Sequence, residues 1–302
     1  MLAMPSPALT ARVLSEAMPY LRAYRGKAIV VRFGGRAMED PQLKAAFARD
    51  VALLRLVGMK PIVVHGGGWR IDELMRTMGI TPTRHRGRRV TDAATLNLIE
   101  MVLDELNQEL TGLVNAHGGR AVGLNGQDGR FIRARPLIDG REVATGFVGD
   151  IAGVDVELVN LLLSRNFVPV VLPIGVGDDG TAFHLSSDQL AGAIARALGA
   201  EKLILMTNVA GITGRNGRIA YIVTASEAQS LLDDGFIPEP LTARVGAAVR
   251  AVREGVRSVH IIDGGVPSAL MLEVLTADGV GTAVRSDAGP HFLEDSRAYL
   301  MG

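Results

Sequence analysis

The sequence predicts an α/β fold of three layers, in which a mainly parallel central sheet lies between helices. The first observation is composition. Hydrophobic residues make up 48% of the 302-residue chain but aromatic residues only 4%, so the core must be aliphatic. The second is order, because short aliphatic runs alternate along the chain with segments of helical period. Buried parallel strands with helices on both faces have this pattern.

In the first half of the chain, aliphatic runs predict strands at residues 28–33, 61–64, 121–124 and 168–173. Helices are predicted at residues 9–24, 39–57, 70–78 and 155–165. A longer helix, capped by Thr91 or Asp92, is predicted to run to about residue 115. Residues 126–153 are rich in glycine and arginine, which indicates hairpins over a site rather than core.

In the second half, strands are predicted at residues 202–206, 258–262 and 282–284. Helices are predicted at residues 187–198, 226–232, 241–254 and 269–275. The pattern divides the chain into an N-terminal helix in residues 1–25, an N-terminal lobe in residues 26–173 and a C-terminal lobe in residues 174–302.

Composition excludes several classes of protein. Lysine plus arginine and aspartate plus glutamate number 32 each, so nothing indicates wholesale binding to nucleic acid or to an anionic membrane. The absence of cysteine excludes a disulfide scaffold and a thiolate metal site, and it fits a reducing compartment. Without a signal-peptide pattern or a membrane-spanning apolar stretch, we expect a cytoplasmic protein.

Two glycine turns each follow a buried strand: Gly34 and Gly35 after residues 28–33, and three glycines at 66–68 after residues 61–64. Without a Cβ, glycine lets backbone N–H groups approach an anion, and the following helix directs its positive end to the same place. A plain tight turn is the alternative for either turn. Neither turn has the G-x-G-x-x-G or the Walker A pattern, so a Rossmann-type dinucleotide site and a P-loop are not indicated.

Phosphoryl transfer to an acid needs backbone donors, cations for the migrating charge and a carboxylate that holds those cations. Arg32 stands inside a buried strand beside the first glycine turn, where an unpaired charge would be costly. Arg244 is a second candidate cation. Asp188, at the start of the helix 187–198, is the candidate carboxylate, and plain capping of that helix is the alternative.

Two further stretches are candidates for binding. Residues 86–92, RGRRVTD, are either a guanidinium clamp on a carboxylate or a solvated surface loop. A polar, glycine-rich loop follows the strand 202–206, where an open parallel sheet takes a nucleotide; it contains Asn208, Gly211, Gly214 and Gly217. No structural metal is predicted, because the histidines lack metal-ligand spacing: His65, His85, His117, His184, His260 and His291.

Eight sequence blocks occur in order along the chain: VVRFGG, PIVVHGGG, RGRRVTD, AVGLNGQDG, PVVLPIGV, AEKLILMTNVAGI, VHIIDGGVP and GVGT. In these blocks, over about residues 9–285, the chain resembles the N-acetylglutamate kinase branch of the amino-acid kinase family. Several blocks, RVTD and HIIDG among them, are specific to that branch. The resemblance implies the three-layer fold of amino-acid and carbamate kinases.

The resemblance implies ATP-dependent phosphorylation, with Mg²⁺, of the γ-carboxylate of N-acetyl-L-glutamate in arginine biosynthesis. The implied catalytic residues are Arg32, Asp188 and Arg244. The implied substrate-binding residues are Gly67, Gly68, Arg89 and His184, of which Arg89 grips the substrate carboxylate. The implied nucleotide-binding residues are Gly34, Gly35, Thr207, Asn208 and Gly211.

The resemblance also implies assembly and regulation. The N-terminal helix with Tyr20 is similar to the extension that links dimers into a hexameric ring in arginine-inhibited members. His260, Glu273 and Gly279 match the positions that bind the arginine effector in those members, and Tyr20 is implied as a fourth effector-binding residue. The implied partners are N-acetyl-L-glutamate or a close analogue, L-arginine, and further copies of the chain in a dimer or hexamer.

Four positions depart from the family pattern. The family has lysine where this chain has Arg32 and Arg244, asparagine where it has His184, and aspartate where it has Asn208. Arginine keeps the positive charge, but its planar fork is longer than a compact ammonium and does not replace it freely. Two alternatives to a working kinase stay open: an arginine-binding pseudo-kinase that serves as a regulatory subunit, and a relative of the kinase-like domain of acetylglutamate synthases.

Overall fold

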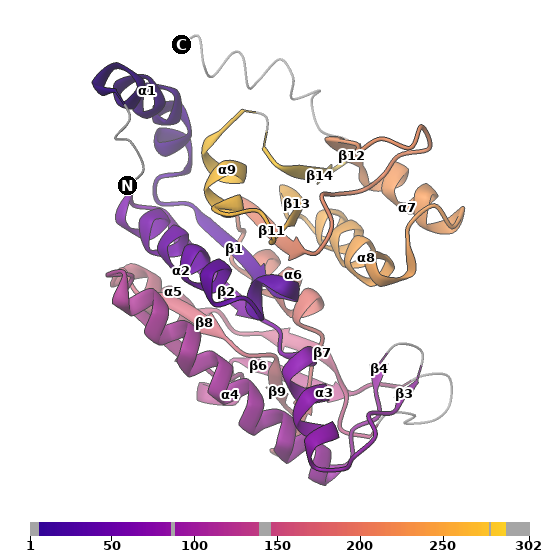
Figure 1. Cartoon of the computed structure of the whole chain (residues 1–302). Coiled ribbons are helices and arrows are strands. Elements are labelled where there is room, and N and C mark those ends of the chain that lie inside the picture. Colours follow the sequence, from indigo (N-terminus) through magenta and orange to yellow (C-terminus); the bar gives the residue numbers. More distant parts are fainter. Residues whose placement is uncertain (1–5, 86–87, 139–145, 278, 288–302) are drawn as a thin grey trace.

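The computed structural model describes residues 6–85, 88–138, 146–277 and 279–287 (Figure 1). Arg86 and Gly87 of the basic turn, and His291, lie outside the described residues. So do the first five residues of the N-terminal helix predicted at 1–25 and the end of the C-terminal lobe. Within the described ranges, no helix is both long and apolar enough to span a lipid bilayer.

An eight-stranded sheet forms the centre of the molecule, in the order β12-β14-β13-β11-β1-β2-β8-β5. Its strands are β1 (Ala28–Phe33), β2 (Lys60–His65), β5 (Ala121–Leu124), β8 (Val168–Val171), β11 (Lys202–Thr207), β12 (Ile222–Thr224), β13 (Ser258–Asp263) and β14 (Gly281–Arg285). Neighbouring strands pair in parallel, except β13 and β14, which are antiparallel. The predicted α/β fold with a mainly parallel sheet is therefore confirmed.

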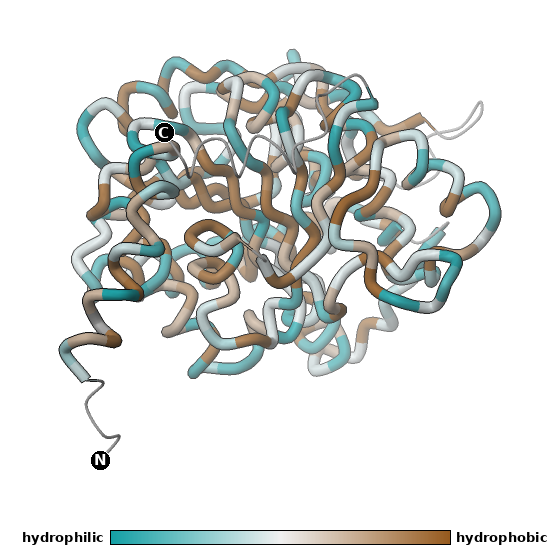
Figure 2. Tube along the Cα trace, turned by 90° about the horizontal axis from the view of Figure 1, so that it is seen from above, coloured by the Kyte–Doolittle hydropathy of each residue, from teal (hydrophilic) through white to brown (hydrophobic). Residues whose placement is uncertain are grey.

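Helices cover both faces of this sheet (Figure 1). One core cluster holds side chains of α2 (Pro41–Leu56), α3 (Gly68–Thr77), α4 (Ala93–Ala116) and α9 (Ala269–Leu275). The other holds side chains of α5 (Glu157–Ser164), α6 (Ser187–Ala197), α7 (Ala225–Asp233) and α8 (Glu239–Arg253). Figure 2 shows the apolar strands running through the middle of the molecule, with polar segments around them.

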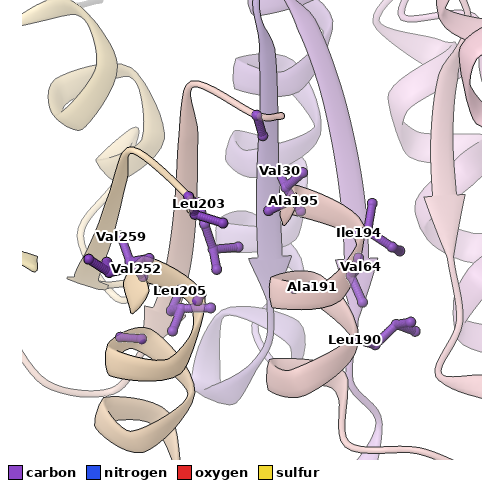
Figure 3. Packing of buried hydrophobic residues seen from close by; sticks show 14 of the residues in the cluster. Val30, Val64, Leu190, Ala191, Ile194, Ala195, Leu203, Leu205, Val252 and Val259 are labelled. Atoms are coloured by element: carbon purple, nitrogen blue, oxygen red, sulfur yellow. The ribbon is translucent and has the colours of Figure 1, made fainter. Parts of the chain in front are cut away.

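Successive side chains of a strand point to opposite faces of the sheet, and this alternation determines which helices each side chain contacts. Along β1, Ile29 and Val31 belong to the cluster of α2 and α4, whereas Val30 belongs to the cluster of α6 and α8. Figure 3 shows Val30 among the side chains of the second cluster, with Ala195 of α6 labelled beside it. Because side chains of a strand point alternately to opposite faces, Arg32 lies on the face that α6 covers.

A smaller sheet in the order β10-β9-β6-β7 lies beside the main one. β6 (Ile132–Pro136) and β7 (Gly149–Val154) form an antiparallel pair, which confirms the hairpin predicted within residues 126–153. The expectation that this segment lies outside the core is wrong, because Phe131, Ile132 and Ala134 belong to the core cluster of α6 and α8. The sequence analysis did not predict β9 (Ile174–Val176), β10 (Ala182–His184) or β12, because three-residue strands show no period. It also missed β3 (Arg84–His85) and β4 (Arg88–Arg89), which pair with each other.

Polar caps define where the helices begin. The predicted cap at Asp92 is confirmed, because its carboxylate accepts a hydrogen bond from the backbone N–H of Thr95 at 2.7 Å and α4 follows. The helix predicted from residue 39 begins at Pro41 instead, since Asp40 caps it and a short 3₁₀ turn, η1 (Gly35–Met38), precedes it. Helix α1 (Pro7–Tyr24) precedes β1 and contacts α9.

Candidate active site

The carboxyl ends of β1, β2 and β11 lie side by side, and the two glycine turns begin there. The backbone N–H of Gly66 donates to the carbonyl of Phe33 at 3.0 Å, so the turn after β2 is joined directly to the end of β1. Helix α6 begins beneath them with Ser186 as its cap. The capping alternative for Asp188 is therefore wrong, because another residue caps this helix.

Arg32 is buried beneath the glycine turns, with 7% of its surface exposed. Its Nε atom lies 2.9 Å from Oδ1 of Asp188 and donates to Oγ of Ser187 at 3.2 Å, and Nη1 donates to the carbonyl of Met206 at 3.3 Å. Burial lowers the pKa of Arg32, and the charge of Asp188 opposes that shift. The predicted cation and carboxylate thus form one buried ion pair.

Arg244 approaches the same carboxylate from α8. Its Nε atom lies 3.8 Å from Oδ1 of Asp188, and Nη1 donates to the carbonyl of Pro240 at 3.0 Å. Asp188 therefore lies between two guanidinium groups that come from different elements. We refer to Arg32, Arg244 and the carboxylate of Asp188 that holds them as the cation triad. The structure therefore brings together the three residues that were predicted for catalysis.

The guanidinium of Arg32 takes up the space between the two glycine turns. A Cβ on Gly34 would overlap this group, and a Cβ on Gly66 would lie 3.2 Å from its Nη2 atom. Gly35 has a φ of +73° and packs against Oδ1 of Asn208, which accepts a hydrogen bond from the N–H of Arg36 at 2.8 Å. Asn208 therefore tethers the first glycine turn to the end of β11.

Two other residues of the predicted nucleotide loop shape the backbone. The hydroxyl of Thr207 accepts from the N–H of Val209 at 3.1 Å and donates to the carbonyl of Ile262 at 3.2 Å. Gly211 has a φ of +151° and packs against Oγ1 of Thr282, which accepts from the N–H of Ile212 at 2.8 Å. Thr207 and Gly211 thus fix the course of the loop that follows β11.

Arg89 lies at the other side of the second glycine turn and is 5% exposed, so it does not belong to a solvated loop. Its Nη2 atom donates to the carbonyl of Gly68 at 3.3 Å, and Nη1 pairs with Oδ1 of Asp72 at 2.5 Å. Burial alone would raise the pKa of Asp72, but its bonds with Arg89 and Arg84 lower it overall. Asp72 thus holds the candidate clamp in position.

His184 lies at the end of β10, where its backbone N–H donates to the carbonyl of Phe147 at 2.9 Å. Its enclosed ring and the positive charges of Arg89 and Arg84 lower its pKa to about 4. The imidazole is therefore neutral at neutral pH. It adds hydrogen-bonding capacity next to the clamp without adding positive charge.

A second polar cluster lies under α9, on the sheet face opposite α6. Nδ1 of His260 pairs with Glu273, and the other oxygen of that carboxylate accepts from the N–H of Val280 at 2.7 Å. Gly279 packs directly against Glu273, so three of the predicted effector residues lie together. Tyr20, the fourth, lies one turn before Tyr24 on α1. Burial raises the pKa of Tyr24, and the nearby Glu201 and Tyr20 add to this shift.

Lys202, which belongs to this second cluster, was not predicted as a site residue from the sequence. Its Nζ atom lies 3.2 Å from Nε2 of His260 and 5.1 Å from the centre of the Tyr24 ring. Burial lowers the pKa of Lys202 to about 8, and burial with the nearby lysine lowers that of His260 to about 4. Lys202 is the first residue of the buried strand β11, so a charge in a buried strand, the signal that indicated Arg32, could also have indicated Lys202.

The site fits a phosphate-bearing ligand because it combines side-chain-free glycine turns with two arginines. For a divalent metal, the described residues contain no group of three or more histidine, aspartate or glutamate side chains that could hold an ion. Magnesium commonly binds through one or two carboxylates together with phosphate oxygens and water. A magnesium ion here would therefore arrive with the nucleotide and take few ligands from the chain.

The comparisons with known proteins agree with this geometry. The model of the amino acid kinase family matches residues 27–263. Acetylglutamate kinase of Chromobacterium violaceum is 50% identical over 281 residues, which cover 91% of this chain and 97% of that protein. The acetylglutamate kinase of Nitrosospira multiformis is 45% identical over 289 residues, which cover 94% of this chain and 99% of that protein.

Solved structures show the same fold. N-acetylglutamate synthase from Neisseria gonorrhoeae, complexed with coenzyme A and N-acetyl-glutamate, has a TM-score of 0.84 at 27% identity, over 95% of this chain and 68% of the synthase chain. Carbamate kinase from Giardia lamblia has a TM-score of 0.63 at 14% identity, over 87% of this chain and 99% of that chain. From the family match and the identity to these relatives, the chain belongs to the amino acid kinase family.

Proposed function

We propose that this protein is an acetylglutamate kinase, which transfers the γ-phosphoryl group of ATP to the γ-carboxylate of N-acetyl-L-glutamate. The observation that carries the proposal is the cation triad, whose Arg32 lies between two glycine turns, while Arg89 contacts the second of these turns through the carbonyl of Gly68. The 50% and 45% identities to acetylglutamate kinases over nearly the whole chain support it. The synthase, at 27% identity, is a more distant relative.

In this proposal each part of the site has a separate task. Arg89 binds a carboxylate of the substrate through its planar guanidinium, and neutral His184 contacts the substrate beside it. Arg32 and Arg244 stabilise the negative charge that spreads over the migrating phosphoryl group, while Asp188 orients both guanidinium groups. ATP supplies the phosphoryl group, and Mg²⁺ would neutralise charge on its phosphates.

In this proposal the two lobes bind different substrates. Residues 26–173 bind the acyl-amino-acid through the second glycine turn, Gly67 and Gly68, and Arg89. Residues 174–302 bind the nucleotide through Thr207, Asn208 and Gly211, together with the first turn. The reaction belongs to arginine biosynthesis and takes place in the cytoplasm.

One observation favours a second candidate, a regulatory subunit without turnover. The guanidinium of Arg32 already occupies the space between Gly34 and Gly66, where a phosphoryl oxygen would bind. If this group does not move aside, the site holds no transferred phosphate. The second polar cluster, with His260 and Glu273, would then carry the remaining function, which is arginine binding.

ADP release with ATP, Mg²⁺ and N-acetyl-L-glutamate separates the two candidates. The kinase turns over, and Asp188→Asn lowers its rate by about 100-fold or more, because both arginines lose their common partner. The matched control is Asp233→Asn, an exposed acid on α7, which keeps the native rate. Absence of turnover in the purified native chain contradicts the kinase and supports the regulatory subunit.

We also propose that L-arginine binds next to Glu273 and His260. The support is a buried carboxylate that lies within reach of α1 and that could accept a guanidinium. L-arginine is expected to raise the melting temperature of the native chain, and Glu273→Gln is expected to abolish this shift. Glu254→Gln, an exposed acid paired with Arg196, is the control that keeps it.

Helix α1 is proposed as the contact that links dimers into a hexamer. Four large apolar side chains on it are more than two-fifths exposed: Leu9, Val13, Leu14 and Met18. Leu14→Glu is expected to lower the mass of the assembly measured by light scattering. Leu161→Glu, at a similarly exposed leucine on α5, is expected to leave the mass unchanged, and an equal mass for all three proteins contradicts the proposal.

A further inference from the structure

His65, the last residue of β2, is completely buried and makes two hydrogen bonds that the proposed reaction does not yet use. Its Nδ1 atom lies 2.8 Å from the carbonyl oxygen of Gly66, and its Nε2 atom lies 3.1 Å from Nδ2 of Asn107. Alternation along β2 explains the direction of the ring: Ile62 and Val64 belong to the cluster of α6, so His65 points to the opposite face, where α4 carries Asn107.

The hydrogen bonds define which nitrogen carries the proton. Nδ2 of Asn107 also donates to the carbonyl of Val170 at 2.8 Å, so the amide group is oriented with its nitrogen toward the ring. An amide nitrogen only donates, and therefore Nε2 of His65 accepts and Nδ1 carries the proton. Burial, with the charge of Arg32 on β1, lowers the pKa of His65 to about 4, so the ring keeps this neutral form at neutral pH.

The bond from Nδ1 draws the carbonyl of Gly66 back toward the ring. In a trans peptide the carbonyl oxygen and the following N–H point in opposite directions, and no described peptide bond is cis. The N–H of Gly67 is consequently directed away from the ring. Gly66 cannot offer its own N–H, because that group donates to the carbonyl of Phe33.

Gly67 itself is held firmly. A Cβ at this position would lie 2.9 Å from side-chain atoms of Leu103 and Leu106, so its Cα packs against α4. Gly67 precedes the first residue of α3, where N–H groups have no acceptor within the helix. Among the described residues, no hydrogen bond is recorded for this N–H.

From these contacts we propose that His65 is a positioning residue, which aims the N–H of Gly67 at the transferred phosphoryl group, and that Asn107 sets the tautomer that makes this possible. The inference rests on the proposed function, which places Gly67 beside the acyl-amino-acid, since it names the ligand of the Gly67 N–H as the phosphoryl group that migrates to this substrate. His65 acts through the peptide bond and does not touch the substrate. An N–H that is directed at the charge of the transition state lowers the barrier without tightening ground-state binding.

Two substitutions of His65 test the roles of Nδ1 and Nε2 separately. The side-chain amide of asparagine reaches the position of Nδ1, whereas that of glutamine reaches the position of Nε2. His65→Asn thus keeps a donor to Gly66 and loses the contact with Asn107. His65→Gln keeps the contact with Asn107 and loses the donor, although glutamine is closer to histidine in volume.

The proposal predicts that His65→Gln lowers kcat by about 100-fold with little change in KM, as loss of one directed donor does. His65→Asn is expected to keep kcat within about 10-fold of the native value. Melting temperatures of both variants report loss of packing, which is greater for the smaller asparagine. If kcat follows the melting temperature, so that His65→Gln is the more active variant, the positioning role is overturned.

The amide signal of Gly67 in protein labelled with ¹⁵N-glycine tests the same point without turnover. Addition of ATP with Mg²⁺ is expected to shift this signal in the native chain and in His65→Asn, but not in His65→Gln. If the native chain binds ATP and shifts the signal yet releases no ADP, the kinase proposal fails and the positioning role stands. If the native chain turns over and the Gly67 signal stays fixed, the positioning role fails and the kinase proposal stands.

Discussion

The Nε atom of Arg32 lies 2.9 Å from Oδ1 of Asp188, and the two side chains are only 9% and 15% exposed. One comes from the central strand β1 and the other from the first turn of α6, so the ion pair joins distant parts of the chain. A buried pair of this kind adds little net stability when intact, but removal of one partner leaves an uncompensated charge. The pair therefore couples the integrity of the core to the chemistry of the site.

Asp188→Asn tests this coupling through stability. Loss of the carboxylate leaves Arg32 buried beside a neutral amide, and we expect the free energy of unfolding to fall by about 3 kcal/mol. Urea unfolding measures the change. Arg32→Met is expected to be far less harmful in the Asp188→Asn background than in the native chain; equal losses in both backgrounds contradict the coupling.

Replacement of Arg32 and of Arg244 by lysine is expected to destabilise the fold to different extents. Arg32→Lys loses part of the set of bonds to Ser187 and Met206, so the free energy of unfolding should fall by about 1–2 kcal/mol. Arg244→Lys should change it by less than about 0.5 kcal/mol, because Arg244 is 3.8 Å from Asp188 and partly exposed. The control is Arg250→Lys, an exposed residue on the same helix. A larger loss for Arg244→Lys than for Arg32→Lys would overturn this ranking.

Gly34→Ala should inactivate the site. Its Cβ would overlap the guanidinium of Arg32, which then has to leave its position between the glycine turns. We expect at least a 100-fold lower rate of ADP release, of the order seen when one preorganised group is lost. Gly112→Ala, in open space on α4, should keep the rate and raise the free energy of unfolding by about 0.5–1 kcal/mol. Equal rates for the two variants would contradict the close approach at Gly34.

Acid should destabilise the fold already in the pH range where unfolded histidine titrates, above the ordinary pKa values of aspartate and glutamate. Burial, with nearby positive charges, lowers the pKa of His65, His184 and His260 to about 4, whereas unfolded histidine titrates near pH 6.5. Between these values the unfolded chain binds more protons, so the free energy of unfolding falls as the pH falls. Burial raises the pKa of Asp50 to about 6, and Asp50 therefore opposes part of this effect.

Urea unfolding between about pH 7 and about pH 4.5 measures this dependence. His260→Gln should reduce the slope of the free energy of unfolding against pH by the equivalent of about one bound proton. Asp50→Asn should make this slope steeper, because the group that opposes the histidines is removed. A free energy of unfolding that stays constant or rises toward acid contradicts the assignment of neutral histidines in the folded chain.

The larger features of the fold were predictable because they depend on local patterns. Buried strands such as residues 28–33 and 202–206 are continuous aliphatic runs, and the cap at Asp92 is a local signal. β9 and β10 were missed, since the pairing of β9 with β6 and of β10 with β9 is set by tertiary contacts rather than by periodicity. The 3₁₀ turn before α2 was missed for the same reason, because Asn208, which directly follows the distant strand β11, holds it.

The candidate site was only partly predictable. A charge inside a strand indicated Arg32, and glycine turns after strands predicted the candidate phosphate site. The partner of Arg89, Asp72, lies on a helix that appears from sequence to be an ordinary exposed one, so only the folded chain reveals the pair. The bond between His65 and Asn107 was equally hidden, because it depends on which face of β2 meets α4.

Helix α6 imposes a constraint on how the length of this chain can change. Leu190, Ile194 and Ala195 hold one side of the helix against the sheet (Figure 3). Asp188 reaches Arg32 only when the helix has this rotation about its axis. A single inserted or deleted residue turns the helix by about 100° between these points. Insertions and deletions are therefore expected in the exposed loop 214–217 but not within residues 187–197, so the spacing from Asp188 to the buried face of α6 should be invariant in active relatives.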